Sequence, residues 1–500
     1  MKDFNPLPQQ LCFDNENGDF PRLLPVTEFT AFKMLSALNA RKATGPDGIP
    51  AWVLKENADL LAAPVADIIN SSFKEARLPE SWKKANITPI PKQKPVRDIN
   101  KHLRPISLTA IVSKVAEEFV VENYVKPAVL KKIDSNQYGA IPNSSTTIAL
   151  LSMLQSWNKA TDGNGAAVRV LLLDFKKAFD LIDHNLLVEK IRSFDIPKWV
   201  LHWIMDFLSF RKQRVKLKFD CFSEWKLVPA GVPQGTKLGP WLFLIMINDL
   251  KLPNNEMWKF VDDTTVSEVI EKDQTSNLQN QMDTLANSIS RDKFQLNETK
   301  CKEMRICFGS NTNDLQPITI NNITLDTVQH AKVLGLVIAS NLKWNIHVNE
   351  IIKKCRKRLY YLIQLKRANI EVKELLQFYK TCIRPVLEYA CPVFHNSLTL
   401  YLSDDLESVQ KRALKIILPH QEYENALQFT NLQRLSERRN DITTALFQKI
   451  VADSSHKLHD LLPPRLERST MELRTQSSFN TNFNTKRFRN SFITFNSLKM

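Results

Sequence analysis

The chain has 500 residues, of which 43% are hydrophobic, and it carries 68 Lys and Arg against 53 Asp and Glu, for a formal net charge of +15. This length is typical of about three domains of ~150 residues, and the hydrophobic fraction excludes a wholly disordered chain. The positive charge favours a polyanionic partner such as nucleic acid, whose affinity would fall as salt rises. The plainer alternative is that the charge only keeps the protein in solution.

The cysteines and the apolar segments bear on the cellular compartment. Seven cysteines are scattered without a C-x-x-C pair or Cys/His ligand spacing, so no zinc site is predicted and reduced thiols are expected. The N-terminus has no apolar signal core, and the longest apolar run, Trp241–Ile247, is too short to span a bilayer. We therefore expect a cytoplasmic or nuclear protein, neither secreted nor inserted in a membrane.

An acidic pair, Asp262-Asp263, lies between two apolar-rich segments. Since Asp tolerates the left-handed backbone of two-residue turns, the pair is predicted at a hairpin tip. A third carboxylate, Asp174, ends a predicted buried strand, Val168–Leu173. An isolated Asp-Asp is usually a solvated turn, but three carboxylates at the ends of neighbouring strands can hold two magnesium ions for nucleotidyl transfer.

The blocks around these residues resemble those of one family. The segments at Asp174 and Asp262, with Ala230–Pro240 between them, resemble motifs A, C and B of the reverse transcriptases of non-LTR (LINE-type) retrotransposons, nearest to the Jockey and chicken-repeat groups. Further blocks follow the family's order: Leu78–Lys92, His102–Leu108 and Gln137–Thr147 for the fingers, Phe294–Lys300 for motif D, and Val333–Leu336 for motif E, the primer grip. Each block alone is weak, whereas the ordered set over residues 28 to 420 is specific.

The resemblance implies an α+β right-hand polymerase fold with fingers, a palm holding a small antiparallel sheet, and a helical thumb. The implied segments are a linker remnant at 1–27, fingers at 28–165, palm at 166–345, helical thumb at 346–418, and a partly ordered C-terminal tail at 419–500. Thr27 and Asp183 are predicted helix N-caps. The family carries an endonuclease domain ahead of such a linker, so we expect a chain that lacks this domain, with an endonuclease acting in trans.

The expected thumb begins with an amphipathic pattern. Four apolar residues recur at i, i+4, i+8 and i+11, which predicts one buried helix face: Ile351, Cys355, Leu359 and Leu362. The opposite face carries a basic cluster: Lys353, Lys354, Arg356, Lys357 and Arg358. The resemblance implies that this face lies along the backbone of a nucleic-acid duplex, with Lys353, Lys354, Lys357 and Arg358 as contacts. An ordinary solvated basic face is the alternative.

The implied activity is that of an RNA-directed DNA polymerase, which extends a DNA primer 3′-hydroxyl with dNTPs on an RNA template. The implied cofactor is Mg²⁺, two ions, with Mn²⁺ as a substitute. The metal ligands would be the carboxylates of Asp174, Asp262 and Asp263 and the backbone carbonyl of Phe175. Lys300 is implied as the proton donor to the leaving pyrophosphate, with a merely solvated lysine as the alternative.

The resemblance also implies a dNTP site. Arg104 would pair with triphosphate oxygens through its guanidinium, and Lys92 would be a weaker second contact. Gln234 lies in a Gly-flanked loop that would approach the nascent base pair. Phe179 would be the aromatic gate that blocks a ribose 2′-hydroxyl, the alternative being a core aromatic at a helix start.

One departure and two rival functions remain. The acidic box reads Phe260-Val261-Asp262-Asp263 where the family usually has an aromatic residue followed by Ala-Asp-Asp, so Val261 adds bulk beside the primer terminus. The first rival is a decayed or domesticated copy that binds nucleic acid without polymerising, against which the intact carboxylates argue. The second, an RNA polymerase of the palm class, is disfavoured by Phe179, since a dNTP gate would serve no purpose there.

Overall fold

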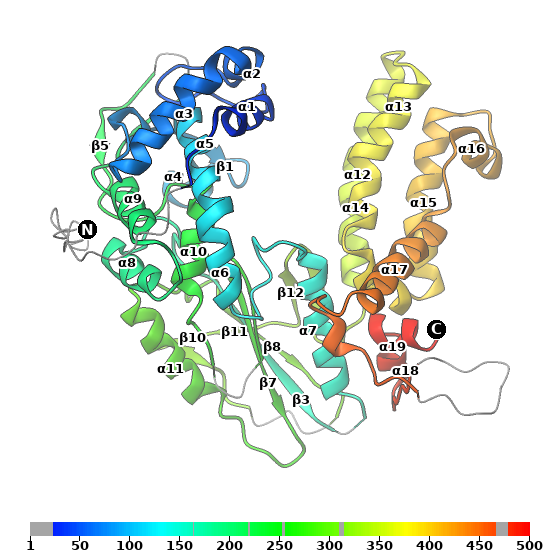
Figure 1. Ribbon diagram of the computed structural model, residues 1–500. Coiled ribbons are helices and arrows are strands. Elements are labelled where there is room, and N and C mark those ends of the chain that lie inside the picture. The colour runs from blue at the N-terminus through cyan, green and yellow to red at the C-terminus, as the bar shows by residue number, and fades with distance from the viewer. Residues whose placement is uncertain (1–23, 164, 219–220, 253–255, 310–314, 467–478) are drawn as a thin grey trace. The chain divides into compact units, whose positions relative to one another are not determined.

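The computed structural model describes residues 24–163, 165–218, 221–252, 256–309, 315–466 and 479–500 (Figure 1). The predicted linker at 1–27 lies almost wholly outside these ranges. The chain forms two compact units: unit 1 comprises Met1–Ala140, Phe175–Lys251 and Leu285–Leu296, and unit 2 comprises Ile141–Asp174, Leu252–Thr284 and Asn297–Met500. Each unit is therefore built from segments that are distant in the sequence.

Unit 1 is built on a four-stranded sheet in the order β2-β1-β4-β5. Strand β1 (Lys84–Pro91) pairs antiparallel with β2 (Leu103–Leu108) and parallel with β4 (Lys212–Val215), which pairs with β5 (Lys226–Leu227). The helices of the unit are α1 (Glu28–Ser36), α2 (Ala51–Glu56), α3 (Ala58–Lys74), α4 (Ile99–His102), α5 (Ile111–Val120), α6 (Lys126–Lys132), α8 (His184–Arg192), α9 (Lys198–Leu208) and α10 (Gly239–Ile247). The short turns η1 (Glu80–Lys83) and η2 (Val121–Val125) complete it.

The core of unit 1 is aromatic, and its helix starts follow the sequence. The Phe73 ring of α3 lies 5.4 to 5.7 Å from the rings of Phe119, Trp199 and Trp203. Thr27 caps α1 by accepting from the Thr30 N–H, and Asp183 caps α8 by accepting from the N–H groups of its first turn. Both predicted N-caps are therefore confirmed.

Unit 2 holds a five-stranded sheet in the order β11-β8-β3-β7-β6 (Figure 1). Its central strand β3 (Ala167–Leu173) pairs antiparallel with β7 (Asp263–Ile270) and β8 (Lys302–Ile306), β6 (Glu256–Phe260) pairs antiparallel with β7, and β11 (Asp326–Thr327) lies parallel to β8. Two further hairpins join β9 (Thr319–Ile320) to β10 (Ile323–Thr324) and β12 (His330–Val333) to β13 (Leu336–Ala339). The predicted strand at 168–173 and the α+β class with a small, mainly antiparallel sheet are confirmed.

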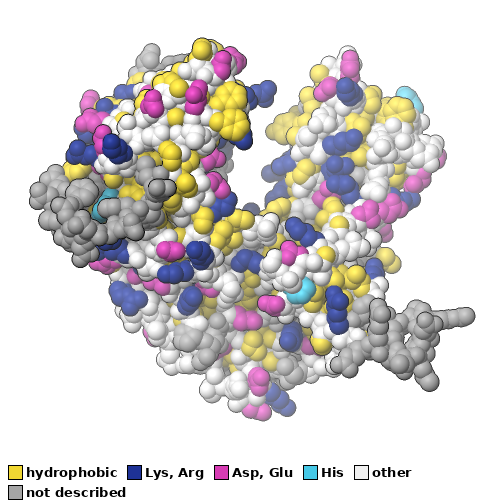
Figure 2. Space-filling model, in the orientation of Figure 1, with side chains coloured by type: hydrophobic (Ala, Val, Ile, Leu, Met, Phe, Trp, Pro, Cys, Tyr) yellow, Lys and Arg dark blue, Asp and Glu magenta, His cyan; other side chains and the backbone are white. Residues whose placement is uncertain are grey.

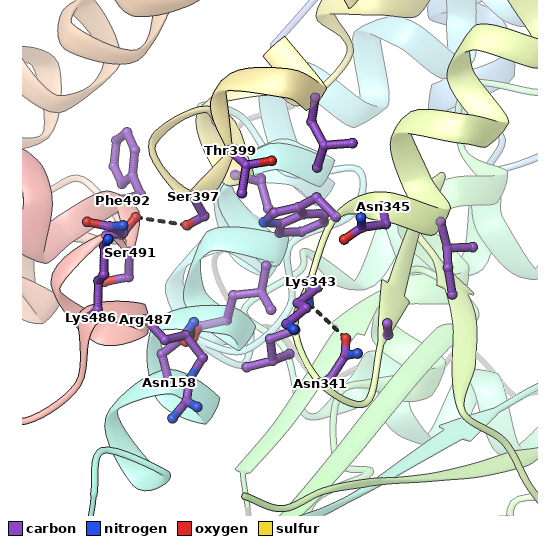
Figure 3. A pocket seen from close by; sticks show the side chains of 18 of the residues that line it. Asn158, Asn341, Lys343, Asn345, Ser397, Thr399, Lys486, Arg487, Ser491 and Phe492 are labelled. Atoms are coloured by element: carbon purple, nitrogen blue, oxygen red, sulfur yellow. Dashed lines mark hydrogen bonds between the residues drawn. The ribbon is translucent and has the colours of Figure 1, made fainter. Parts of the chain in front are cut away.

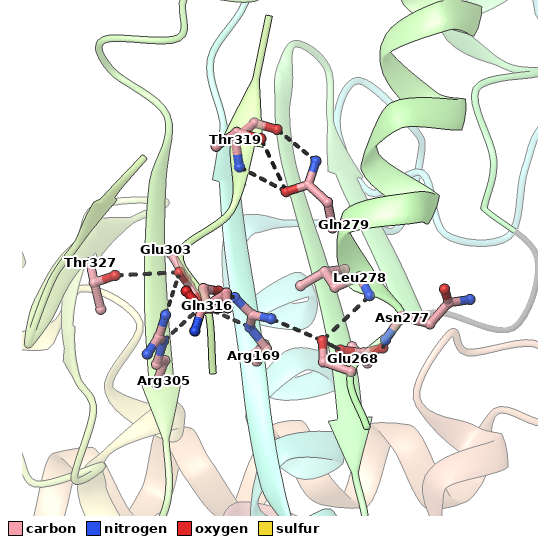
Figure 4. Close-up of polar contacts among 11 residues, drawn as sticks. Arg169, Glu268, Asn277, Leu278, Gln279, Glu303, Arg305, Gln316, Thr319 and Thr327 are labelled. Atoms are coloured by element: carbon pink, nitrogen blue, oxygen red, sulfur yellow. Dashed lines mark hydrogen bonds and ion pairs between the residues drawn. The ribbon is translucent and has the colours of Figure 1, made fainter. Parts of the chain in front are cut away.

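Packing and a buried ionic network fix the register of this sheet. Helix α7 (Thr146–Ala160) packs on it through Trp157, whose ring lies 6.2 Å from that of Trp258. Arg169 of β3 is 3% exposed and donates from Nε to Glu303 of β8 at 2.8 Å (Figure 4). Burial alone would raise the pKa of Glu303, but Arg305 and Arg169 hold it below its usual range. Removing one partner of such a buried pair is costly, so β3 is locked to β8.

The rest of unit 2 is largely helical. Its elements are α11 (Leu278–Arg291, which runs on into unit 1), α12 (Asn345–Arg367), α13 (Val372–Phe378), η3 (Tyr379–Ile383), α14 (Arg384–Glu388), η4 (Cys391–Val393), η5 (His395–Ser397), α15 (Leu400–Ile417), α16 (Tyr423–Thr430), α17 (Leu435–Ala452), η6 (His459–Leu461), α18 (Lys486–Arg489) and α19 (Phe492–Ser497). The predicted amphipathic helix is confirmed as α12, because Ile351, Cys355, Leu359 and Leu362 are all buried. Within the described ranges, every helix is too short or too polar to cross a bilayer.

The segment after residue 418 is more regular than its sequence suggests. Residues expected to form a partly ordered tail include the helices α16 and α17. The buried face of α17 contains Arg439 and Thr443 as well as Phe447. Those polar residues interrupt the apolar periodicity by which a helix is recognised, which is why the sequence alone did not predict it.

Candidate active site

The acidic pair lies at the end of the β6–β7 hairpin. Phe260 pairs with Asp263, so the two-residue turn consists of Val261 and Asp262. The expectation that both aspartates form the turn is corrected by one residue, because Asp263 is the first residue of β7. The register is set by the core: it pairs Met257 with Val266, both buried, and a one-residue shift would turn these side chains to the other face.

Val261 has an unusual backbone conformation in this turn. Its φ is 60°, a region that β-branched residues rarely adopt and that costs about 1–3 kcal/mol. The adjoining sheet pairs hold it there, and both Asp262 and Asp263 are exposed at the hairpin end. The departure from the family box therefore sits at the strained position of the turn, while both acidic side chains remain accessible to a ligand.

Asp174 continues the neighbouring strand toward the same edge. The last residue of β3, Leu173, pairs with Thr264 of β7, and the next pair in this register would set Asp174 opposite Asp263. The side chain of Asp174 is 38% exposed. The strand register thus brings the three predicted carboxylates to one edge of the sheet of unit 2.

A short segment after motif D surrounds Asp174. Its Oδ2 accepts from Asn297 Nδ2 at 3.0 Å and lies 3.4 Å from Lys300 Nζ. The backbone carbonyl of Asp174 accepts from the Asn297 N–H at 2.7 Å. The structure therefore brings the predicted Lys300 to Asp174. Asn297 is a contact that the sequence reasoning missed, although it belongs to the quoted motif D block.

The donor chemistry of this edge fits magnesium, which prefers oxygen ligands and carboxylates in particular. Oδ1 of Asp174 has no hydrogen-bond or ion-pair partner among the described residues. In the described part of the chain, no three His, Cys, Asp or Glu side chains are grouped as a ready-made metal cage. The carboxylates thus form an open acidic edge. Phe175, proposed as a carbonyl ligand, follows Asp174 and forms a β-bridge with Leu296.

Phe179 lies in unit 1 with one ring face covered. Its ring stacks on Phe243 of α10, with centroids 4.5 Å apart and planes 13° apart, and the side chain is half-buried. Its carbonyl accepts from the Val232 N–H at 2.8 Å. The residue therefore packs as a core aromatic on one side while part of it stays accessible, as a gate would require.

The loop that carries Gln234 is held tightly. Gln234 Nε2 donates to Asp180 Oδ1 at 3.0 Å, and its carbonyl accepts from the Ser107 N–H at 2.8 Å. Gly231 has φ 83°, and a Cβ there would lie 2.6 Å from the carbonyl oxygen of Asp180, so no other residue fits. Burial raises the pKa of Asp180, and the hydrogen bond from Gln234 opposes the shift. Asp180 and Gln234 line a cavity of about 350 Å³.

Glu117 is a site residue that the sequence reasoning missed. It is 0% exposed, and its Oε2 accepts from the N–H groups of Lys237 at 2.8 Å and Leu238 at 3.2 Å, just ahead of α10. Burial raises the pKa of Glu117, while the Leu238 N–H favours the charged form. This buried carboxylate anchors the end of the Gln234 loop, and an acidic residue within the apolar helix α5 was the signal that could have found it.

The two basic residues predicted to contact the triphosphate lie at one end of the β1–β2 pair. Arg104 of β2 pairs with Ile90 of β1, and the Lys92 N–H donates to the His102 carbonyl just beyond the last pair. Both side chains are exposed. Their positions allow an anion to be reached from this end of the sheet of unit 1.

The basic cluster lies on the solvent side of α12. Lys353, Lys354, Lys357 and Arg358 are all exposed, and Figure 2 shows Lys and Arg side chains gathered over the surface of α12 and the helices beside it. Arg358 Nη1 donates to the Cys382 carbonyl, so it is partly engaged within the protein. Tyr360 and Tyr361, 59% and 60% exposed, extend the same face.

Known proteins resemble this chain over most of its length. Residues 90–338 match the family described as reverse transcriptase (RNA-dependent DNA polymerase), and residues 344–384 match the N-terminal family of alkylated DNA repair protein alkB homolog 8. The probable RNA-directed DNA polymerase from transposon X-element of Drosophila melanogaster is 24% identical over 443 residues, covering 84% of this chain and 48% of that protein. The RNA-directed DNA polymerase from mobile element jockey of the same species is 26% identical over 417 residues, covering 78% and 44%.

The chain spans about half the length of the curated relatives it matches. Among solved structures, apo telomerase from Candida tropicalis, truncated from the C-terminal domain, is similar with a TM-score of 0.36 and 14% identity, covering 56% of this chain and 60% of that one. That likeness is too weak to carry an argument. The sequence relatives and the matched family are the informative comparisons.

Proposed function

The chain belongs to the reverse transcriptases of the non-LTR, LINE-type retrotransposons, and from this premise we propose that it extends a DNA primer with dNTPs on an RNA template. The observation that carries the proposal is the register of unit 2, which directs Asp174, Asp262 and Asp263 to one sheet edge. An acidic edge of this kind is what nucleotidyl transfer needs to position divalent cations.

The proposed roles follow from the contacts of each residue. Asp174, Asp262 and Asp263 would hold two Mg²⁺ ions, or Mn²⁺ in their place, with the Phe175 carbonyl as a further oxygen ligand. Bound divalent ions activate an attacking hydroxyl and stabilise the leaving oxygen. Lys300, 3.4 Å from Asp174 Oδ2, would give a proton to the departing pyrophosphate.

Unit 1 would supply the groups that bind and select the nucleotide. The exposed Arg104 and Lys92 would bind the triphosphate, Arg104 through a bidentate guanidinium. Gln234, held by Asp180, would meet the nascent base pair, and Phe179 would contact the sugar. In this proposal, residues 28–165 act as fingers, 166–345 as palm and 346–418 as thumb. The protein works in the cytoplasm or nucleus, with an endonuclease in trans as a further partner.

Primer extension tests the proposal. The purified chain is incubated with poly(rA)/oligo(dT), dTTP and Mg²⁺, and binding of the template–primer is measured in parallel. The proposal predicts extended products that depend on the divalent ion and on the RNA template. Tight binding without extension would contradict it and identify a decayed copy that retains only nucleic-acid affinity.

Replacing Lys353, Lys354 and Lys357 by Ala should weaken template–primer binding about equally for different sequences, since phosphate contacts carry no sequence information. The slope of log affinity against log salt should flatten by up to ~0.9 for each phosphate that the variant no longer neutralises on a B-form duplex. The matched control replaces three exposed lysines on other helices of unit 2, Lys373, Lys415 and Lys449. Equal slopes for the cluster variant and the parent would make the cluster a solvated face.

Replacing Glu117 by Gln should raise the KM for dNTP several-fold and change kcat less. The Gln amide N–H₂ would oppose the N–H groups of Lys237 and Leu238, so the end of the Gln234 loop loses its anchor. Steady-state kinetics at saturating template–primer measure the split. The control is Glu118→Gln, whose carboxylate pairs only with the Lys237 side chain at 2.8 Å. A KM for Glu117→Gln equal to that of this control would refute the anchoring role.

A further inference from the structure

A cavity of about 780 Å³ opens within unit 2, at a place that the polymerase roles do not use (Figure 3). Its walls come from α7, the loop at 339–346 that joins β13 to α12, the segment at 393–402, and the C-terminal helices α18 and α19. Its volume is in the range of sites that enclose a small organic molecule.

The charge of the cavity is one-sided. Lys343, Lys486 and Arg487 line it, and none of the described residues in its lining is an Asp or Glu. The nearest acidic partner of Arg487 is Asp162, whose carboxylate is already bonded by the N–H groups of Asn484 and Thr485. A cavity with cations and no acidic lining favours an anion over a cation or a neutral molecule.

Two polar atoms of the lining are buried without a partner. Asn158 is 8% exposed; its Nδ2 donates to the Leu154 carbonyl, but its Oδ1 accepts nothing. Arg487 is fixed by Nη2, which donates to the Thr161 carbonyl at 2.5 Å, and by its guanidinium lying 3.6 Å over the Phe308 ring, yet its Nε also lacks a partner. Buried polar groups are normally satisfied. One vacant acceptor and one vacant donor thus reach the cavity from different elements (Figure 3).

The remaining lining is mostly apolar and aromatic. It comprises Leu151, Leu154, Leu342, Trp344, Leu402 and Phe492. We propose that this cavity binds a small aromatic organic anion that carries a hydrogen-bond donor. Its ring body packs on the apolar walls, its donor meets Asn158 Oδ1, and its anionic group meets the Arg487 Nε–H with Lys486 and Lys343 nearby.

The position of the cavity gives such a ligand a consequence. Trp344 and Asn345 line it, and α12 begins at Asn345. The C-terminal helices line the same cavity, so an occupant connects them to the start of the helix that carries the basic cluster. Because a ligand stabilises the state it binds, occupancy should raise the melting temperature of the chain. The inference does not depend on polymerase activity.

The probe is 1-anilinonaphthalene-8-sulfonate, which combines an aromatic body, an N–H donor and a sulfonate. Fluorescence titration of the full chain should give one saturable site. Asn158→Leu removes the vacant acceptor at nearly constant shape, so it should raise the Kd at least fivefold and also raise the melting temperature of the ligand-free chain. Arg487→Leu should weaken binding further, while Arg489→Leu, an exposed arginine of the same helix outside the lining, should change nothing.

A second probe separates the polar contact from general stickiness. 1-Naphthalenesulfonate lacks the N–H donor, so it should bind the parent more weakly and show no further loss in Asn158→Leu. Equal effects of Asn158→Leu on the two probes, no effect of this variant on either, or binding without saturation at one site would overturn the proposal.

Discussion

Asp262→Asn is expected to lower the rate of RNA-templated primer extension by roughly 10²–10³-fold, the range that loss of one preorganised electrostatic group costs. Asp262 lies exposed in the β6–β7 turn, beside the first residue of β7 and at the edge to which Asp174 points along its strand. The substitution keeps the shape of the side chain and removes the charge that holds a divalent cation. Single-turnover extension with saturating template–primer measures the effect.

The binding arm of this experiment shows whether the loss is catalytic. Affinity for the template–primer should stay within about twofold, because the thumb cluster is untouched and phosphate contacts set affinity. Asp273→Asn, an exposed carboxylate in the turn after β7, is the matched control and should retain the parental rate. An Asp262→Asn variant that extends primers like this control would remove the hairpin from the catalytic site.

Phe179→Val is expected to increase ribonucleotide use relative to deoxyribonucleotide use by roughly 10- to 200-fold, the range that a steric difference in a pocket supplies. The ring of Phe179 is supported on one face by Phe243 and is half-buried. A smaller side chain at this position leaves room for a 2′-hydroxyl. The ratio of kcat/KM for rTTP and dTTP on the same template measures the change.

Packing alone cannot produce that change in selectivity. Phe294→Val removes another ring of the same cluster, since Phe294 lies 6.1 Å from Phe243 and is 6% exposed. This control should lose stability and overall activity but keep the parental rTTP/dTTP ratio. If both variants shift the ratio equally, Phe179 is a packing residue and the sugar is selected elsewhere.

Local patterns predicted the elements that carry the site. The buried strand at 168–173, the caps at Thr27 and Asp183, and the buried face of α12 were all predicted from residue type and spacing, because each depends on neighbours within a few turns of chain. The hairpin was predicted one residue off. Its register is decided by the burial of Met257 against Val266, which the Asp-Asp pair does not reveal.

The contacts that the sequence reasoning missed are long-range. Asn297 bonds Asp174 across 123 residues, and Glu117 bonds the Lys237 N–H across 120. No periodicity reports such pairs, and the family resemblance singled out only Lys300 near Asp174. The helix α17 was missed for another reason: Arg439, fully buried in its core face, makes the segment look polar. The roles of Arg104, Gln234 and Phe179 came from the resemblance, and they stay predictions.

Iron-directed cleavage tests the central claim most directly. Fe²⁺ takes the oxygen-rich sites of Mg²⁺, and with ascorbate and peroxide it releases hydroxyl radicals that cut the backbone beside the bound ion. With template–primer bound, the account predicts cuts at the end of β3 next to Asp174 and in the β6–β7 turn at 261–263, both suppressed by excess Mg²⁺ and by Asp262→Asn. Cuts confined to other segments, or cuts that Asp262→Asn leaves unchanged, would contradict it.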